Sequence, residues 1–405
     1  MSGPIVIVGA SLTGGTAAAT LREQGFDGPL YLIGAEPRAP YERPPLSKEY
    51  LRGEKPFEKS LVRPAEWWEA NGVETRFGAT VERVDTAARE VVLVGGERIG
   101  YDKVLIATGV RNRKLDAPGV ELEGVHSLRT VEDSDRMRAD AERAKRAVVV
   151  GMGFIGAEVA ASLRTLGLDV TAVEPTPTPL HRVLGSEVGG AIGALHADHG
   201  VHMRFEDTVV ALEGSTRVET AVTKSGARLP CDIVVVGVGV EPVTDPVAGT
   251  DIELDNGIAV DERCRTNVEG VYAAGDIANH FHPLYGRRMR VEHWQNAMRH
   301  GAHAAKSMLG SEEPYVEVHW FWSDQYDANI QYAGHHREWD SLVIRGSIPD
   351  RSFLAFYVKD GLVDGIAALN RGKELRRAMG IIRARKAVEE SALRDESVDL
   401  KTLGA

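Results

Sequence analysis

The stretch Ala147-Val148-Val149-Val150-Gly151-Met152-Gly153-Phe154-Ile155-Gly156 decides the fold class of this chain. An apolar run of strand character leads into glycines spaced as G-x-G-x-x-G, and an Ala/Leu-rich helical stretch follows. A tight reversal from strand to helix requires a residue without a Cβ, and close approach of the backbone to a pyrophosphate requires another. The following helix points its free N–H groups at that anion. The stretch therefore predicts a dinucleotide-binding βαβ unit.

A second stretch of the same kind lies near the N-terminus. There an apolar run, Ile5-Val6-Ile7-Val8, leads into Gly9-Ala10-Ser11-Leu12-Thr13-Gly14, so that Ser11 stands where the second glycine belongs. Serine is small, and its hydroxyl can itself donate to a phosphate. Two plain strand–turn–helix units without ligand are the alternative. Two correctly flanked copies favour two bound dinucleotides and an enzyme that passes electrons between them.

Each glycine turn should be followed by an acid at the end of the second strand, where a carboxylate accepts hydrogen bonds from ribose hydroxyls. Glu36 follows the strand-like run 30–34, and Glu174 ends the run 169–173. A carboxylate at Glu174 repels a 2′-phosphate, and Pro175 follows where an arginine would bind one. This pattern favours NADH over NADPH, although a solvated strand end is an alternative for Glu174.

Composition limits the class of protein. The 405 residues are 43% hydrophobic and 26% charged, with a net charge of −11, which argues against nucleic acid as a partner. No apolar run has membrane-spanning length, and no secretory signal begins the sequence, so we expect a cytoplasmic protein without a membrane association. Cys231 and Cys264 form no C-x-x-C pair. Neither a redox disulfide nor a metal cluster held by this chain is therefore expected.

The chain reads as an internal repeat followed by a different region. Each dinucleotide unit ends in an apolar strand and a small-residue turn, Ala107-Thr108-Gly109 in the first and Gly237-Val238-Gly239 in the second. Beyond Tyr315, strand-like runs at 341–345, 352–359 and 362–368 precede a basic helix near 374–390. The pattern predicts an α/β protein with two Rossmann-like dinucleotide-binding domains and a C-terminal α+β domain. The expected boundaries are 1–112 with 245–314, then 113–244, then 315–405.

Four motifs carry a resemblance to a known family. They are Ala107-Thr108-Gly109, the segment Val271-Tyr272-Ala273-Ala274-Gly275-Asp276, the segment 40–48 (PYERPPLSK) and the segment 319–326 (HWFWSDQY). Together they resemble the FAD-dependent ferredoxin reductases of oxygenase systems, which include putidaredoxin reductase, rhodocoxin reductase and the reductases of aromatic-ring dioxygenases. The resemblance implies a glutathione-reductase-like fold in which the first domain binds FAD, the middle domain binds NADH and the third supports the flavin and the partner face.

The resemblance also implies roles for individual residues. Residues expected to contact the cofactors are Gly9, Ala10, Ser11, Thr13, Gly14, Glu36, Arg43, Lys48, Val81, Ala107, Thr108, Gly109, Arg129, Gly151, Gly153, Phe154, Ile155, Gly156, Glu174, Gly237, Val238, Gly239, Gly275, Asp276, Glu292, His293 and Trp294. Asp276 would accept from the ribityl hydroxyls, and Trp294 would pack at the isoalloxazine ring. Lys48 and Glu158 would pair near flavin N5 as the catalytic pair, unless Glu158 only stabilises its helix.

The implied reaction has two halves. NADH passes a hydride to the flavin, and the reduced flavin gives single electrons to a [2Fe–2S] ferredoxin that supplies a cytochrome P450 or a ring-hydroxylating dioxygenase. Such ferredoxins are acidic, so a basic docking patch is expected. The candidates are Arg371, Lys373, Arg376 and Arg377, with Trp322 at the partner side of the flavin and Arg287, Arg288 and Arg290 as a second cluster. A solvated helix face and core packing, respectively, are the alternatives for the first cluster and for Trp322.

Two rival functions fit the same fold. One is another flavoenzyme, such as an NADH oxidase, a nitrite-reductase flavoprotein or an NADH dehydrogenase. A peroxide-handling enzyme is disfavoured, since Ala10-Ser11 and Leu46-Ser47-Lys48 offer no cysteine. The other is an NADH-sensing flavoprotein that controls a partner and turns over slowly. Fold alone does not distinguish these from a ferredoxin reductase.

Overall fold

The structure is a computed structural model that describes residues 3–404. The chain divides into two compact units, each assembled from separated stretches of sequence. Unit 1 comprises Met1–Glu42, Phe57–Arg111 and Glu241–His319. Unit 2 comprises Arg43–Pro56, Asn112–Val240 and Trp320–Ala405. No helix within 3–404 is both long and apolar enough to cross a lipid bilayer.

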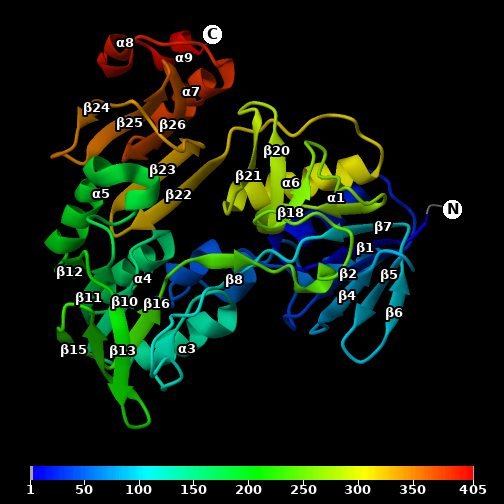
Figure 1. Cartoon of the computed structure of the whole chain (residues 1–405), viewed down its shortest axis with the longest axis horizontal. Coiled ribbons are helices and arrows are strands. Elements are labelled where there is room, and N and C mark those ends of the chain that lie inside the picture. The colour runs from blue at the N-terminus through cyan, green and yellow to red at the C-terminus, as the bar shows by residue number, and fades with distance from the viewer. Residues whose placement is uncertain (1–2, 405) are drawn as a thin grey trace. The chain divides into compact units, whose positions relative to one another are not determined.

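Unit 1 is built on a five-stranded parallel sheet in the order β19-β7-β1-β2-β3, of which β7, β1 and β2 are labelled in Figure 1. Its strands are β1 (Ile5–Val8), β2 (Leu30–Gly34), β3 (Val73–Phe77), β7 (Lys103–Ile106) and β19 (Val271–Ala273). Strand β2 pairs with one edge of β1, and β7, later in the chain, pairs with the other edge. The strand order therefore reverses at β1, and such a switch point is where open α/β sheets bind ligands.

Side chains of β1 alternate between two cores because successive residues of a strand face opposite sides of the sheet. Ile5 and Ile7 pack with residues of helices α1 (Leu12–Glu23) and α6 (Trp294–Met308). Val6 and Val8 pack on the other face. Two three-stranded sheets pack on that face, the antiparallel sheet β4-β5-β6 and the mixed sheet β18-β20-β21. Their strands are β4 (Val81–Asp85), β5 (Glu90–Leu93), β6 (Arg98–Gly100), β18 (Ile258–Val260), β20 (Ala278–His282) and β21 (Arg287–Arg290).

Unit 2 repeats the same sheet. Five parallel strands run in the order β12-β11-β10-β16-β9, with the first strand of the motif, β10, again in the centre. The strands are β9 (Val125–His126), β10 (Arg146–Val150), β11 (Asp169–Glu174), β12 (His202–Phe205) and β16 (Ile233–Val236). The helices are α3 (Val131–Ala141), α4 (Phe154–Thr165) and α5 (His181–Asp198), and β13 (Val209–Gly214), β14 (Val218–Thr223) and β15 (Arg228–Pro230) form a small antiparallel sheet. The predicted repeat of two Rossmann-like sheets is confirmed.

The C-terminal part of unit 2 is an antiparallel sheet in the order β22-β23-β26-β25-β24. It consists of β22 (Trp320–Gln325), β23 (Ala328–Gly334), β24 (Ser341–Ser347), β25 (Ser352–Lys359) and β26 (Leu362–Leu369), followed by α7 (Gly372–Ala384), α8 (Glu390–Arg394) and α9 (Leu400–Leu403). Apolar residues of α5, including Leu184 and Ile192, share a core with Phe353 and Tyr357 of β25. The expected α+β region is therefore present.

The predicted basic helix near 374–390 was too long. Helix α7 ends at Ala384, because Arg385 adopts a left-handed conformation with φ of 50°. The Arg385 guanidinium then donates to Asp364, which fixes the reversal. Residues 385–389 have ordinary helix propensity, so this tertiary contact overrides a weak local preference.

Candidate dinucleotide and redox site

At two positions of the second glycine turn, the surrounding backbone leaves no room for a Cβ. Gly151 has φ of 90°, and a Cβ there would lie 2.4 Å from the Gly237 carbonyl oxygen. A Cβ on Gly156 would lie 1.9 Å from the Gly151 carbonyl oxygen. Gly153 differs, because a Cβ built on it meets no atom within 4 Å. Glycine at that position leaves open space beside the N-terminus of α4, as close approach of a pyrophosphate would need.

The first turn follows the same plan. Gly9 has φ of 116°, and its Cβ would lie 2.2 Å from the Ala107 carbonyl oxygen, while a Cβ on Gly14 would lie 1.9 Å from the Gly9 carbonyl oxygen. Ser11 caps α1 with extended backbone, φ −118° and ψ −159°. Gly153 caps α4 in the same conformational region. Serine therefore fits the position without backbone strain, and its side chain is not used to cap the helix.

The Gly275-Asp276 segment lies against the first turn within unit 1. Gly275 has φ of 76°, and a Cβ there would lie 2.2 Å from the Thr13 hydroxyl oxygen. Its N–H donates to Nδ1 of His300 over 3.2 Å, and the Asp276 carbonyl accepts from Arg290. The structure thus brings together two motifs that are far apart in sequence, as an anion turn and a ribityl-binding carboxylate would require.

The two predicted ribose acids have different surroundings. Glu36 is half-buried and accepts a hydrogen bond from the Tyr41 hydroxyl. Glu174 is 7% exposed, and its carboxylate accepts from the Met152 N–H at 2.6 Å and from the Thr176 hydroxyl at 2.6 Å. Glu174 therefore braces the second glycine turn directly, a role that the sequence did not reveal.

The predicted pair of Lys48 and Glu158 is formed within unit 2. Lys48 Nζ lies 2.8 Å from Glu158 Oε2, and the two side chains are only 7% and 5% exposed. The Ser47 hydroxyl donates to the same carboxylate oxygen. Ser323, on β22, donates to the other oxygen, Oε1, over 2.7 Å. Glu158 therefore does more than stabilise its own helix, because its carboxylate accepts from a buried ammonium and two hydroxyls.

A chain of buried hydrogen bonds extends from Glu158. The Gln325 amide donates to the Ser323 hydroxyl at 3.2 Å, and Nε2 of His196 lies 2.9 Å from Gln325 Oε1. The Tyr326 hydroxyl lies 3.2 Å from the other His196 nitrogen. Burial lowers the pKa of His196 to about 4, so the imidazole is neutral at pH 7. The sequence did not predict these contacts, since α5 supplies His196 from a stretch distant from Ser323 and Gln325.

The remaining expected cofactor residues lie on turns or element ends. In unit 1, Thr108 donates to the Val243 carbonyl at 2.8 Å, and His293 caps α6, which begins at Trp294. Also in unit 1 are Ala10, Val81, Ala107, Gly109 and Glu292. In unit 2, the Arg43 guanidinium donates to the Arg129 carbonyl, while Phe154 packs edge-on against Phe321 with centroids 4.6 Å apart. Also in unit 2 are Ile155, Val238 and Gly239.

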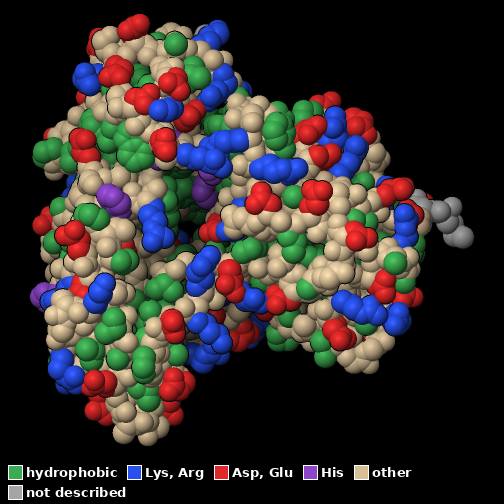
Figure 2. All heavy atoms as spheres, viewed as in Figure 1, with side chains coloured by type: hydrophobic (Ala, Val, Ile, Leu, Met, Phe, Trp, Pro, Cys, Tyr) green, Lys and Arg blue, Asp and Glu red, His purple; other side chains and the backbone are tan. Residues whose placement is uncertain are grey.

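Three of the candidate docking residues lie on α7, and the fourth, Arg371, is the residue that precedes the helix. Lys373, Arg376 and Arg377 are exposed, whereas Arg371 forms an ion pair with Glu396 at 2.7 Å. Trp322 on β22 stacks on Trp320 with ring centroids 5.4 Å apart. In the view of Figure 2, basic and acidic side chains are intermixed over the C-terminal part of the chain, at the top. The exposed cations of α7 are thus a local feature of an otherwise mixed surface.

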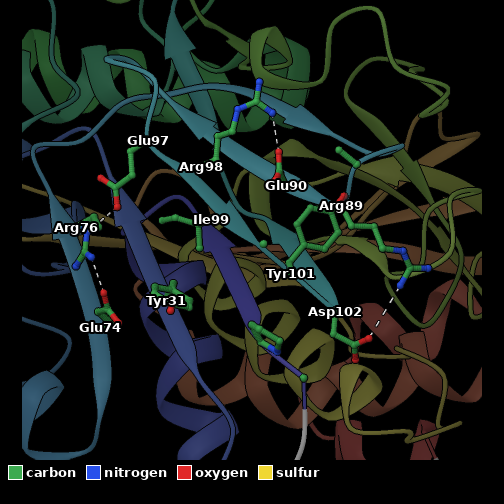
Figure 3. A pocket seen from close by; sticks show the side chains of 14 residues that line it. Tyr31, Glu74, Arg76, Arg89, Glu90, Glu97, Arg98, Ile99, Tyr101 and Asp102 are labelled. Carbon is green, nitrogen blue, oxygen red and sulfur yellow. Dashed lines mark hydrogen bonds and ion pairs between the residues drawn. The ribbon is translucent and has the colours of Figure 1, made fainter.

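A hollow on the surface of unit 1 lies among β3, β5 and β6 (Figure 3). Its charged side chains pair with one another, with Arg76 to Glu74 at 2.5 Å, Arg98 to Glu90 at 2.6 Å and Arg89 to Asp102 at 4.0 Å. None of the predicted cofactor residues lines it. The predictions therefore assign no cofactor to this hollow.

Comparison with known proteins agrees with this geometry. Residues 3–301 match the family described as pyridine nucleotide-disulphide oxidoreductase, and residues 320–404 match the family described as reductase C-terminal. Rhodocoxin reductase of Rhodococcus erythropolis is 38% identical, and the match covers 98% of this chain and 93% of the relative. The ferredoxin–NAD(+) reductase component of the anthranilate 1,2-dioxygenase system of Burkholderia cepacia is 37% identical, with 98% of both chains covered.

Among solved structures, the covalent putidaredoxin reductase–putidaredoxin complex superposes with a TM-score of 0.96 at 32% identity, covering 99% of this chain and 98% of that one. The expected fold class and the use of FAD and NAD(H) are confirmed by these matches. The chain belongs to the pyridine nucleotide-disulphide oxidoreductase family, in the group that carries a reductase C-terminal domain.

Proposed function

We propose that this protein is an NADH-dependent ferredoxin reductase that carries FAD and passes single electrons to a [2Fe–2S] ferredoxin of a cytochrome P450 or ring-hydroxylating dioxygenase system. The observation that carries the use of two dinucleotides is the pair of glycine turns in one chain, each at the switch point of its own parallel sheet. Rhodocoxin reductase and the reductase component of the anthranilate 1,2-dioxygenase system match over nearly the whole chain and support the ferredoxin partner. The two cysteines are free and buried, so the iron–sulfur cluster belongs to the partner.

The residues of unit 1 fit FAD. Backbone N–H groups at the start of α1 would bind the pyrophosphate, because Gly9 and Gly14 allow the close strand-to-helix turn. Glu36 would accept from the adenosine ribose and Asp276 from the ribityl hydroxyls. When bound, FAD supplies an acceptor for a hydride and a donor of single electrons. We assign residues 1–112 and 245–314 to the FAD domain.

The second turn fits NADH. The open space beside Gly153 admits the pyrophosphate, and the N-terminus of α4 offers its N–H groups to it. Glu174 disfavours a 2′-phosphate, since its buried carboxylate would lie near that dianion. We assign residues 113–244 to the NADH domain and 315–405 to the C-terminal domain.

Lys48 and Glu158 are proposed to be the catalytic pair. Lys48 Nζ lies 2.8 Å from Glu158 Oε2, and both side chains are buried. Ser47 and Ser323 restrain the carboxylate and so fix the position of the ammonium. Exposed Arg376, Arg377 and Lys373 are proposed to attract an acidic ferredoxin, and electrostatic steering acts mainly on the association rate. A cytoplasmic location is proposed because the two buried thiols suit a reducing compartment.

The test is a pair of rapid-mixing experiments on the FAD-loaded protein without oxygen. NADH should bleach the flavin absorbance faster than NADPH does, and the reduced protein should then reduce an added [2Fe–2S] ferredoxin. Flavin reduction without any ferredoxin reduction, tested across several ferredoxins, would overturn the proposal. Rapid reoxidation by oxygen alone would instead favour an NADH oxidase.

A further inference from the structure

Three buried histidines gather in unit 1, apart from the glycine turns. His280, His282 and His319 are each 0% exposed, and one ring nitrogen of each lies within 4.8 Å of the others. His280 and His282 are two residues apart on β20, so their side chains leave the same face of the strand. His319 comes from the segment that leads into β22. Two neighbouring chain segments therefore present three imidazoles to one point.

Hydrogen bonding prepares His282 to act as a ligand. Its Nε2 lies 2.9 Å from the Glu317 carbonyl oxygen, so Nε2 carries the hydrogen and Nδ1 keeps its lone pair. That Nδ1 atom is buried and has no hydrogen-bond partner among the described residues. A histidine that donates one ring N–H to a carbonyl and offers its other nitrogen is the usual arrangement at a metal ion. A buried polar atom without a partner also requires an explanation such as an ion.

We propose that His280, His282 and His319 bind one divalent transition-metal ion of the zinc type. Three neutral imidazoles are a common zinc donor set, with water in the fourth position. With Zn–N bonds of about 2.1 Å, the nitrogens of a tetrahedral site are about 3.4 Å apart, so the rings need to close only slightly. The ion would fasten β20 to the segment before β22, which the contact from His282 to Glu317 already joins. This role is structural and does not depend on the proposed function.

One nearby charge opposes the ion. Arg287 on β21 lies directly across from His282 in the strand pair, and its charge acts on that imidazole. A positive charge beside the three imidazoles disfavours a bound dication. Arg287→Gln should therefore increase the affinity for metal, a result that mere packing of three histidines would not give.

The first experiment uses the FAD-loaded full chain after treatment with a chelator. Equilibrium dialysis against Zn2+, read by elemental analysis, should give one ion per chain, and Co2+ in its place should show the visible absorption of a nitrogen-ligated tetrahedral site. X-ray absorption of the zinc-loaded wild type should show imidazole scattering. This measurement needs no variant and so does not depend on whether a substituted protein folds.

Variants then assign the ligands. His282→Gln and His319→Gln should each weaken zinc binding by about 100-fold or more, since loss of even an outer partner costs about 10–100-fold. His303→Gln is the matched control, because His303 lies in the same aromatic cluster, with its ring 5.3 Å from Tyr315, but outside the trio. Flavin content and circular dichroism verify folding. No bound metal in the wild type, or equal binding by the His282, His319 and His303 variants, would overturn the proposal.

Discussion

Replacing Glu158 by glutamine would remove a buried charge without changing the shape of the side chain. Lys48 would then be left as a buried ammonium, since its side chain is 7% exposed and the partner oxygen at 2.8 Å would be neutral. Breaking one side of a buried ion pair costs about 3–5 kcal/mol. For a unit of 150–250 residues, each kcal/mol lowers the melting temperature by about 2–4 °C. Glu158→Gln should therefore lower the melting temperature of unit 2 by about 6–20 °C.

The double variant Lys48→Met with Glu158→Gln makes this reasoning testable. It removes both charges, and replacing a buried pair as a whole is often close to neutral. Differential scanning calorimetry should compare the wild type, Lys48→Met, Glu158→Gln and the double variant. The double variant should melt well above Glu158→Gln. If the double variant melts at or below Glu158→Gln, the buried ammonium is not the source of the loss, and the argument for a buried ion pair fails.

Three further predictions concern the turns, the docking helix and the effect of pH. Gly156→Ala should prevent folding of unit 2, because the added Cβ would lie 1.9 Å from the Gly151 carbonyl oxygen. Gly153→Ala should fold, because its Cβ meets no atom within 4 Å, but it should weaken NADH binding as measured by titration of the flavin-loaded protein. Arg376→Glu with Arg377→Glu should slow ferredoxin reduction by about tenfold at low salt and leave ferricyanide reduction unchanged. His196 has a folded pKa of about 4 against about 6.5 unfolded, so stability should fall by up to about 3 kcal/mol as pH drops through that window.

Each of these three predictions has a control variant or a result that would contradict it. For the glycines, normal NADH binding by Gly153→Ala would contradict the pyrophosphate argument. For α7, exposed Lys224 lies in a loop between β14 and β15, so Lys224→Glu changes charge without touching the docking helix. Equal loss with both acceptors would contradict docking. For the acid effect, the urea midpoint of His196→Gln should depend less on pH between 6.5 and 4 than that of the wild type.

Much of the fold could be predicted because its signals are local. Gly14 and Gly156 each face a carbonyl oxygen of their own turn, and Gly9 and Gly151 have positive φ, so the pattern of small residues identified both sheets at their central strands. The end of α7 was predicted wrongly because Arg385 turns the chain through a contact with Asp364, which propensity does not encode.

The site was less accessible to sequence reasoning because its contacts join distant segments. The pairing of Lys48 with Glu158 came from family resemblance, but the hydroxyl of Ser323 on the same carboxylate arises only when β22 packs on α4. The buried histidine trio was missed for the same reason. His280 and His282 have a visible spacing of two, but His319 completes the group from a segment far along the chain.

The central claim is electron transfer from NADH to a ferredoxin, and one measurement tests it most directly. NADH-driven reduction of cytochrome c by the FAD-loaded protein should be compared with and without an added [2Fe–2S] ferredoxin, while oxygen consumption is recorded. We predict a large rise in cytochrome c reduction that depends on the ferredoxin. No rise across several ferredoxins, with NADH oxidised at the expense of oxygen instead, would contradict the account.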